Sequence, residues 1–84
     1  MNQESLQDFS SLARSVQLGS TYEHYKGMRY KILGVGRHSE SLEEMVVYQA
    51  LYGAGDIWVR PVTMFLENVL INGELTPRFK KVGQ

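Results

Sequence analysis

The sequence predicts a small, mainly β domain with a barrel or roll architecture and one helix before it. Short β-prone segments follow one another from residue 21 onward, with tight glycine-containing turns between them. Asn72-Gly73 lies between two apolar runs, which is a strong hairpin signal. At 84 residues there is room for one domain, and a hydrophobic content of 43% excludes a disordered chain.

Residues 1–20 are predicted to be an amphipathic helix and a linker. We expect the helix over about residues 5–17, with Ser5 and Asp8 as a capping box and Gly19 as its stop. A helix of this length is marginal alone, so its apolar stripe must pack on the following domain or, alternatively, on a partner chain. The stripe consists of residues at steps of three and four, namely Leu6, Phe9, Leu12, Ala13 and Val16.

Residues 21–84 are predicted to be an SH3-like β domain of five to six short strands. We expect strands at 21–25, 28–35, 45–52, 57–60, 69–71 and 75–76, and a short helical turn within 62–68. Gly34 and Gly36 predict a bulge, a bend or a close backbone approach. Pro77 restricts the last strand to an edge or an end. Curling into a barrel would cover the bare face and both open edges of such a sheet. An OB-type barrel is the less favoured alternative, because its usual length is greater and the strands here are very short.

Composition narrows the function classes. The formal net charge is zero, so attraction of nucleic acid or membrane would have to come from a local patch. The absence of cysteine excludes disulfides and thiolate metal sites. The polar first residues do not match a signal peptide, and no apolar run approaches the roughly 20 residues of a membrane span. We therefore expect a cytoplasmic protein that makes no use of a membrane.

Motifs for catalysis, cofactors and metals are weak. Gly34-Val35-Gly36 lacks the third glycine of a dinucleotide loop. His38, Ser39 and Glu40 are the residue types of a hydrolase triad, but neighbours in one turn point in different directions, and Ser39 or Glu40 is expected to bond nearby backbone amides instead. His24 and His38 have no metal-ligand spacing. We predict no catalytic residue, no cofactor and no metal.

The candidate ligand-binding residues lie between positions 37 and 60. Trp58 and Arg60 alternate with Ile57 and Val59, so they share one face of their strand. Tyr48 and Tyr52 share a face of the preceding strand, and the two faces together would form an aromatic platform beside arginines. Aromatic rings stack planar groups or take a proline-rich peptide, and arginine pairs with phosphate or carboxylate. The predicted ligand-binding set is Arg37, His38, Glu40, Tyr48, Trp58 and Arg60.

A structural explanation competes with this site. A domain this small needs large side chains in its core, so Trp58, Tyr30 and Tyr48 could be core residues with arginines stacked on their rims. The segment 24–27, His-Tyr-Lys-Gly, is first a strand end with its turn, and alternatively a basic lip of the same site. The register of strand 45–52 is ambiguous by one residue. A slip of one residue exchanges the inward and outward faces of this strand.

The chain resembles a family of small bacterial domains classed as a domain of unknown function. The resemblance rests on motifs in a fixed order, with Tyr-x-His-Tyr-Lys-Gly at 22–27, Arg-His-Ser-Glu at 37–40 and Trp-Val-Arg-Pro at 58–61 among them. It covers roughly residues 21–80 and leaves the N-terminal helix outside. It implies an SH3-like fold and a cytoplasmic bacterial protein, and it brings no activity, ligand or cofactor.

Two hypotheses follow. The first is a non-catalytic binding module for an anionic or aromatic-anionic ligand, either a metabolite or a nucleic-acid segment. The alternative is a protein-interaction or assembly protein that uses the N-terminal helix and the barrel surface, with a protein partner or a homodimer. An enzyme comes third.

Overall fold

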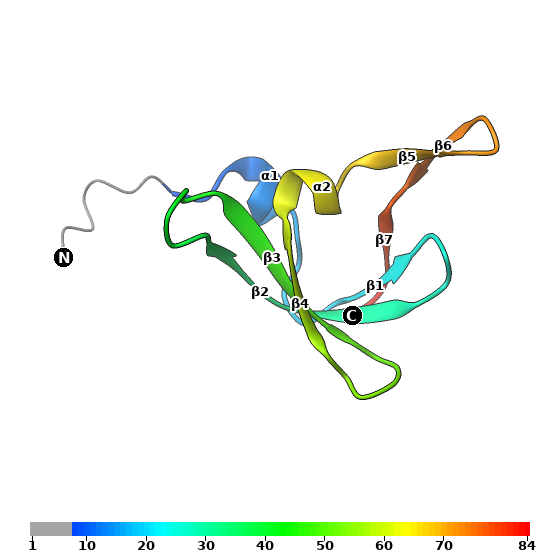
Figure 1. The fold of residues 1–84 in the computed structure, drawn as a ribbon, viewed down its shortest axis with the longest axis horizontal. Coiled ribbons are helices and arrows are strands. Elements are labelled where there is room, and N and C mark those ends of the chain that lie inside the picture. The colour runs from blue at the N-terminus through cyan, green and yellow to red at the C-terminus, as the bar shows by residue number, and fades with distance from the viewer. Residues whose placement is uncertain (1–7) are drawn as a thin grey trace.

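A computed structural model describes residues 8–84 and contains seven strands and two single-turn helices (Figure 1). The mainly β class predicted from the sequence is confirmed, and one strand, β7, was not predicted. The elements in chain order are α1 (Ser11–Arg14), β1 (Thr21–His24), β2 (Arg29–Arg37), β3 (Glu44–Ala50), β4 (Ile57–Pro61), α2 (Val62–Phe65), β5 (Asn68–Ile71), β6 (Glu74–Pro77) and β7 (Phe79–Gly83).

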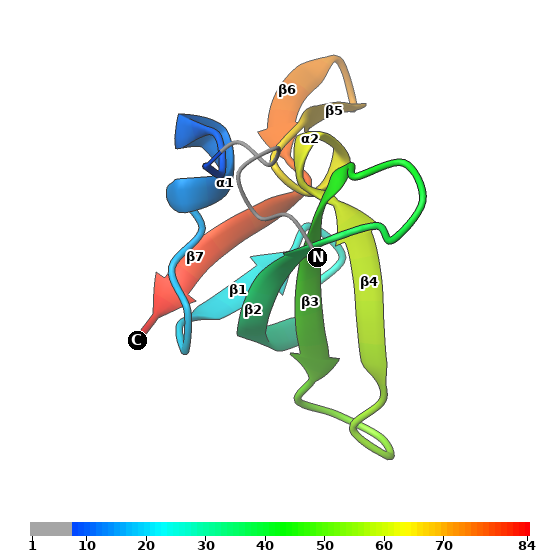
Figure 2. The same ribbon diagram turned by 90° about the vertical axis from the view of Figure 1, so that its left-hand side faces the viewer.

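The strands form two antiparallel sheets. One has five strands in the order β4-β3-β2-β1-β7, and the other is the β5–β6 hairpin. Figure 2 shows β4 and β7 as the outermost strands of the larger sheet. The prediction of a closed barrel is therefore wrong for the described part of the chain. Its physical reason is visible in Figure 1, where the β5–β6 hairpin extends away from the larger sheet instead of joining β4 to β7.

Three local predictions about the strands are confirmed. The register of β2 against β3 shifts between Ile32 and Gly34, which is the bulge expected from the glycines. Asn72 and Gly73 have φ of 51° and 82°, the left-handed conformations that a two-residue hairpin turn requires. Pro77 is the last residue of β6, as expected for a proline at a strand end.

The hydrophobic core lies between the inner face of the five-stranded sheet and the two helical turns. Phe65 of α2 is completely buried and stacks on Phe79 of β7, with 4.1 Å between ring centroids. Tyr22 and Tyr48 meet the Phe65 ring edge-on at 5.4 and 5.2 Å. Phe79 thus links the unpredicted strand to the aromatic core. The other buried apolar residues are Ala13, Val16, Tyr30, Ile32, Val46, Ala50 and Val62.

The helix predicted over 5–17 is wrong in its extent within the described residues. Only Ser11–Arg14 is helical, and the Ser10 side chain caps it by accepting a hydrogen bond from the Ala13 amide at 3.1 Å. The predicted capping residue Ser5 and the stripe residue Leu6 lie outside the described residues. Serines explain the short helix, because their hydroxyls compete for backbone groups, as Ser15 does by donating to the Leu12 carbonyl at 2.6 Å.

The N-terminal segment is attached to the sheet. Ala13 and Val16 are buried in the core, so they pack on the β domain. Glu44 accepts hydrogen bonds from the Ser10 amide and hydroxyl, at 2.6 and 2.7 Å. These bonds lower the pKa of Glu44, because they stabilise its ionised form. Across residues 8–84, no helix has the length and apolar character needed to cross a membrane.

Candidate functional site

Strand register brings Tyr48, Trp58 and Arg60 onto one face of the sheet. Tyr48 pairs with Trp58 and Val46 pairs with Arg60 across β3 and β4. Because directly paired residues point to the same side, these side chains join the inner face that carries the core. They line a cavity of about 180 Å³, which we call the aromatic well. Its lining residues are His24, Met28, Tyr30, Tyr48, Tyr52, Trp58, Arg60 and Phe79.

The floor of the aromatic well is a set of edge-to-face rings. Tyr48 is only 4% exposed, and its ring centroid lies 5.2 Å from that of Tyr30 and 5.5 Å from that of Phe79. Tyr30 and Tyr52 share a hydrogen bond of 2.7 Å between their hydroxyls. Burial, together with this bond, raises the pKa of Tyr30 to about 12, so its hydroxyl stays protonated at neutral pH. The floor is therefore aromatic, and its Tyr30 hydroxyl is uncharged at neutral pH.

Trp58 forms an exposed wall of the aromatic well. Half of its surface (50%) is exposed, whereas the paired Tyr48 is buried. The alternative in which Trp58 belongs to the core therefore does not hold, although it does hold for Tyr30 and Tyr48. A half-exposed indole beside buried rings offers exposed aromatic surface on which a planar group could stack.

Arg60 provides the positive charge of the aromatic well. Its Nε donates a hydrogen bond to the Tyr48 hydroxyl at 3.3 Å, and its guanidinium carbon lies 5.7 Å from the centroid of the Phe79 ring. Within residues 8–84 the two terminal nitrogens of Arg60 have no hydrogen-bond or ion-pair partner. A guanidinium held by its Nε and open at both terminal nitrogens matches the two oxygens of a carboxylate or phosphate.

His24 adds a neutral donor on the other side of the aromatic well. Its Nδ1 accepts a hydrogen bond from the Lys26 amide at 3.2 Å, and its ring stacks on Tyr25 and meets Phe79 edge-on. Burial lowers the pKa of His24, and the nearby charges of Arg60, Arg78 and Lys26 lower it further. His24 is therefore neutral at pH 7, with its proton on Nε2, in a region of positive potential.

A second groove adjoins the aromatic well through His24. It has a volume of about 190 Å³ and is lined by Glu23, His24, Tyr25, Thr76, Pro77 and Lys80. Lys26 lies nearby, with its Nζ 6.0 Å from the Tyr25 ring centroid. The sequence predicted a strand end with its turn, or a basic lip of the site, for the segment 24–27. This segment contributes His24 to the aromatic well and both His24 and Tyr25 to the second groove.

The other three predicted site residues lie elsewhere. Arg37 is the last residue of β2, five residues after Ile32. Ile32 pairs with Tyr48, and Tyr48 pairs with Trp58, so Arg37 lies roughly 16 Å along the strand from these three residues. Its guanidinium covers the Phe9 ring at 4.5 Å. The structure does not bring Arg37, His38 and Glu40 to the aromatic well.

The turn after β2 has a structural hydrogen-bond pattern. His38 and Glu40 are exposed, and the Nδ1 of His38 accepts from the amides of Glu40 and Ser41 at 3.1 and 3.3 Å. The sequence predicted that Ser39 or Glu40 would accept hydrogen bonds from nearby amides, and this prediction is wrong, because His38 is the acceptor of these bonds. No group of three metal-ligating side chains gathers anywhere in the described chain.

Sequence reasoning did not include five lining residues in the site. Tyr52 was placed on the Tyr48 face and His24 in the basic lip, so signals for both existed. Tyr30 and Met28 lie on or beside β2, whose inner face could be inferred from alternation. Phe79 could not be found, because no strand was predicted after Pro77.

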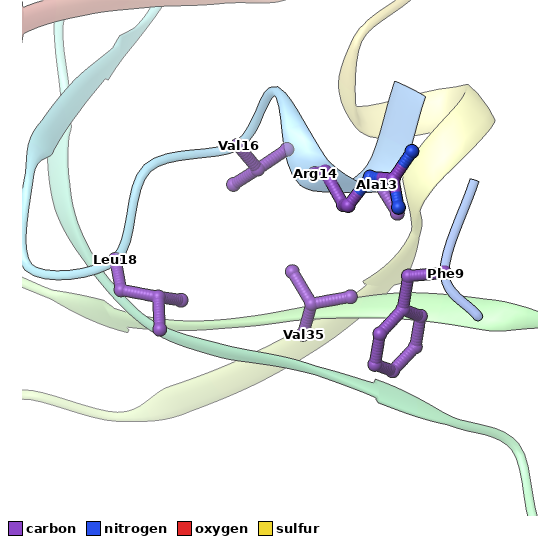
Figure 3. A pocket seen from close by; sticks show the side chains of 6 residues that line it. All are labelled: Phe9, Ala13, Arg14, Val16, Leu18 and Val35. Carbon is purple, nitrogen blue, oxygen red and sulfur yellow. The ribbon is translucent and has the colours of Figure 1, made fainter. Parts of the chain in front are cut away.

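A larger hollow lies under the N-terminal segment (Figure 3). It has a volume of about 420 Å³ and is lined by Phe9, Ala13, Arg14, Val16, Leu18 and Val35. Apart from Arg14 these side chains are apolar, so this hollow has few groups that could orient a charged ligand. The smaller aromatic well carries the better-defined chemistry, and we take it as the candidate site.

Comparison with known proteins gives a family but no activity. Residues 20–81 match the family described as "Protein of unknown function (DUF1653)". The chain is also similar to a protein of that family from Bordetella bronchiseptica, whose crystal structure is known. The two are 34% identical with a TM-score of 0.76, over 86% of this chain and 94% of the other. The comparison with curated proteins found no match.

Proposed function

This chain belongs to the DUF1653 family of proteins of unknown function, and on that premise we propose that the aromatic well is a non-catalytic binding site for an anion carrying a planar group. The observation that supports it best is Arg60, whose terminal nitrogens have no partner among residues 8–84 and which lies beside the half-exposed ring of Trp58. The guanidinium would hold the anionic group and the indole would stack the planar group.

The size of the site favours a small ligand. A volume of about 180 Å³ suits one ring rather than a drug-sized molecule, for which pockets are typically about 300–1,000 Å³. The adjoining groove could extend the site toward Lys80. A chain without net charge lacks the long-range field that steers nucleic acid, so a metabolite is favoured over a nucleic-acid segment.

A binding role is also favoured over catalysis. The residue types of a hydrolase triad, His38, Ser39 and Glu40, are exposed in one turn, whereas catalysis requires converging groups and a shielded oxyanion site. Among the described residues that line the aromatic well, the polar groups belong to His24, Arg60, the Trp58 indole N–H and three tyrosine hydroxyls. The predicted cytoplasmic location stays a prediction.

The test is an amide NMR titration of labelled protein at low salt. The probes are benzoate, uridine 5′-monophosphate and a short single-stranded RNA. We expect saturable shifts at Trp58, Arg60 and His24 with the small anions. Shifts that gather on Arg37 and His38 instead would refute the assignment to the aromatic well.

Two variants and a matched control sharpen the titration. Trp58→Ala and Arg60→Met should each weaken binding at least roughly tenfold, in line with the loss of one stacking or one charged contact. Lys31→Met is the control, because it removes one positive charge from an exposed residue paired with Gln49 on the outer face. Equal weakening by all three variants would indicate nonspecific charge attraction rather than a site.

Assembly through the N-terminal segment is the second candidate function. Leu12 and Leu18 are exposed, and Leu18 lines the apolar hollow of Figure 3. Deleting residues 1–18 would remove the buried Ala13 and Val16, so Leu18→Glu is the cleaner test. Loss of a self-associated species on this substitution would support the second candidate, and an unchanged mass in solution would contradict it.

A further inference from the structure

Within residues 8–84, no strand pairs with the outer edge of β4, and this edge is apolar. β4 is the last strand on its side of the five-stranded sheet, and its residues Ile57, Trp58 and Val59 are 59%, 50% and 56% exposed. Exposed edge strands pair readily with another strand, and proteins usually protect them with lysine or covering segments. We propose that this edge pairs antiparallel with β4 of a second copy, forming a symmetric dimer. This proposal does not depend on the proposed ligand.

Backbone hydrogen bonds decide which groups point to the open edge. The Ala50 amide donates to the Asp56 carbonyl at 2.9 Å, so these two form a hydrogen-bonded pair. Hydrogen-bonded and non-hydrogen-bonded pairs alternate along an antiparallel ladder, so every second residue of β4 bonds to β3. Trp58 and Arg60 therefore also direct their amides and carbonyls toward β3. Ile57 and Val59 therefore point their amides and carbonyls away from the sheet, where a second strand would find them.

One register satisfies both backbone and charge. When two β4 strands meet with Trp58 opposite Trp58, Ile57 of each copy lies opposite Val59 of the other and can exchange both hydrogen bonds with it. The same register places the carboxylate of Asp56 across from Arg60 at both ends. Shifting the centre to Val59 would put Pro61, which has no N–H, opposite Ile57 and would remove the charge pairing.

The other edge of the sheet shows why β4 is the favoured strand. β7 has the sequence Phe-Lys-Lys-Val-Gly over 79–83, so pairing it with itself would bring lysines close together. β4 has the sequence Ile-Trp-Val-Arg-Pro over 57–61, with one positive charge and with the carboxylate of Asp56 just before it. A second copy of β4 thus meets complementary side chains, whereas a second copy of β7 meets like charges.

The dimer would also place a second indole at the rim of the aromatic well. Trp58 of the second copy would lie opposite Trp58 of the first, and Asp56 of the second copy would share Arg60 with any bound anion. Dimer formation and anion binding should therefore weaken each other. For this reason the test is made in chloride buffer with no organic anion present.

The first experiment is sedimentation velocity of the full chain up to roughly millimolar concentration, which detects even a weak dimer. We expect the wild type to associate. Val59→Pro should raise the dimer dissociation constant at least roughly tenfold, since it removes an edge N–H that β3 does not use. Val59→Ile keeps the N–H and should stay dimeric. A monomeric wild type, or a dimer unaffected by Val59→Pro, would overturn the proposal.

A crosslinking experiment tests the register and does not depend on the proline variant folding. The chain has no cysteine, so Trp58→Cys introduces a single thiol. In the proposed register the two copies of residue 58 have Cα atoms about 4.5 Å apart, within the range of a disulfide. Mild oxidation should therefore convert Trp58→Cys to a covalent dimer. Ile57→Cys, whose two copies are offset along the strands, should crosslink much more slowly, and equal rates would contradict the register.

Discussion

Truncating Trp58 should cost far less stability than truncating a core aromatic residue. Burying an aromatic side chain removes about 150–250 Å² from water. Since Trp58 is 50% exposed, about 100 Å² is covered, which is worth at most about 2.5 kcal/mol. Alanine keeps part of that contact, so Trp58→Ala should lower the free energy of unfolding by about 1–2 kcal/mol.

Phe65→Ala is the matched comparison from the core. Phe65 is completely buried and contacts the rings of Tyr22, Tyr48 and Phe79, so its truncation should cost about 4 kcal/mol. A domain of 84 residues is typically stable by about 4–13 kcal/mol, so this variant should lose between about a third and all of its stability.

Urea unfolding followed by far-ultraviolet circular dichroism measures both losses without relying on tryptophan fluorescence. With a slope of about 1.5 kcal/mol per molar urea, the midpoint should fall by about 1 M for Trp58→Ala and by about 2.5 M for Phe65→Ala. Equal losses would refute the reasoning, because they would mean that Trp58 is a core residue rather than the wall of a site.

Four further predictions concern protonation and backbone conformation. Burial and nearby cations lower the pKa of His24, so its contribution to the free energy of unfolding should be fully present above about pH 6.5 and be lost as the pH falls below that value. His24→Gln should flatten this part of the plot of urea midpoint against pH. Burial and a hydrogen bond raise the pKa of Tyr30 to about 12, so stability should fall above about pH 10, and ultraviolet titration should show a lower Tyr30 pKa in Tyr52→Phe. Glu44 has a lowered pKa, so its contribution should be lost as the pH falls below 4.5; Glu44→Gln should remove that dependence and speed amide exchange in residues 10–16. Gly27 has φ of 103°, a conformation that residues with a Cβ rarely adopt, so Gly27→Ala should lower the free energy of unfolding by about 1–2 kcal/mol. An unchanged melting temperature would contradict this.

Part of the candidate site could be predicted from local pattern. Alternation along a strand places Trp58 and Arg60 on one face, whichever strand lies beside them. The residues that the neighbouring strand contributes depend on register, which a one-residue slip reverses. The structure pairs Tyr48 with Trp58, and this pairing positions the buried ring beside the exposed one.

Sequence proximity was misleading for Arg37, His38 and Glu40. These residues belong to the same hairpin region as Tyr48, and the sequence suggested that they meet Trp58. Extended strands separate residues by about 3.3 Å each, so the two ends of a long hairpin are distant. β2 and β3 run from Tyr30↔Ala50 to Arg37↔Glu44, which carries Arg37 to the opposite end from the aromatic well.

The sequence by itself determined the elements that depend on local physics. The strand pattern, the bulge before Gly34 and the Asn72-Gly73 turn follow from side-chain alternation and from φ values that few residues adopt. The tertiary structure alone decided that the sheet formed by residues 8–84 stays open, that β7 brings Phe79 into the core, and that Trp58 is half-exposed. These features depend on contacts between residues far apart in the chain, which local pattern does not specify.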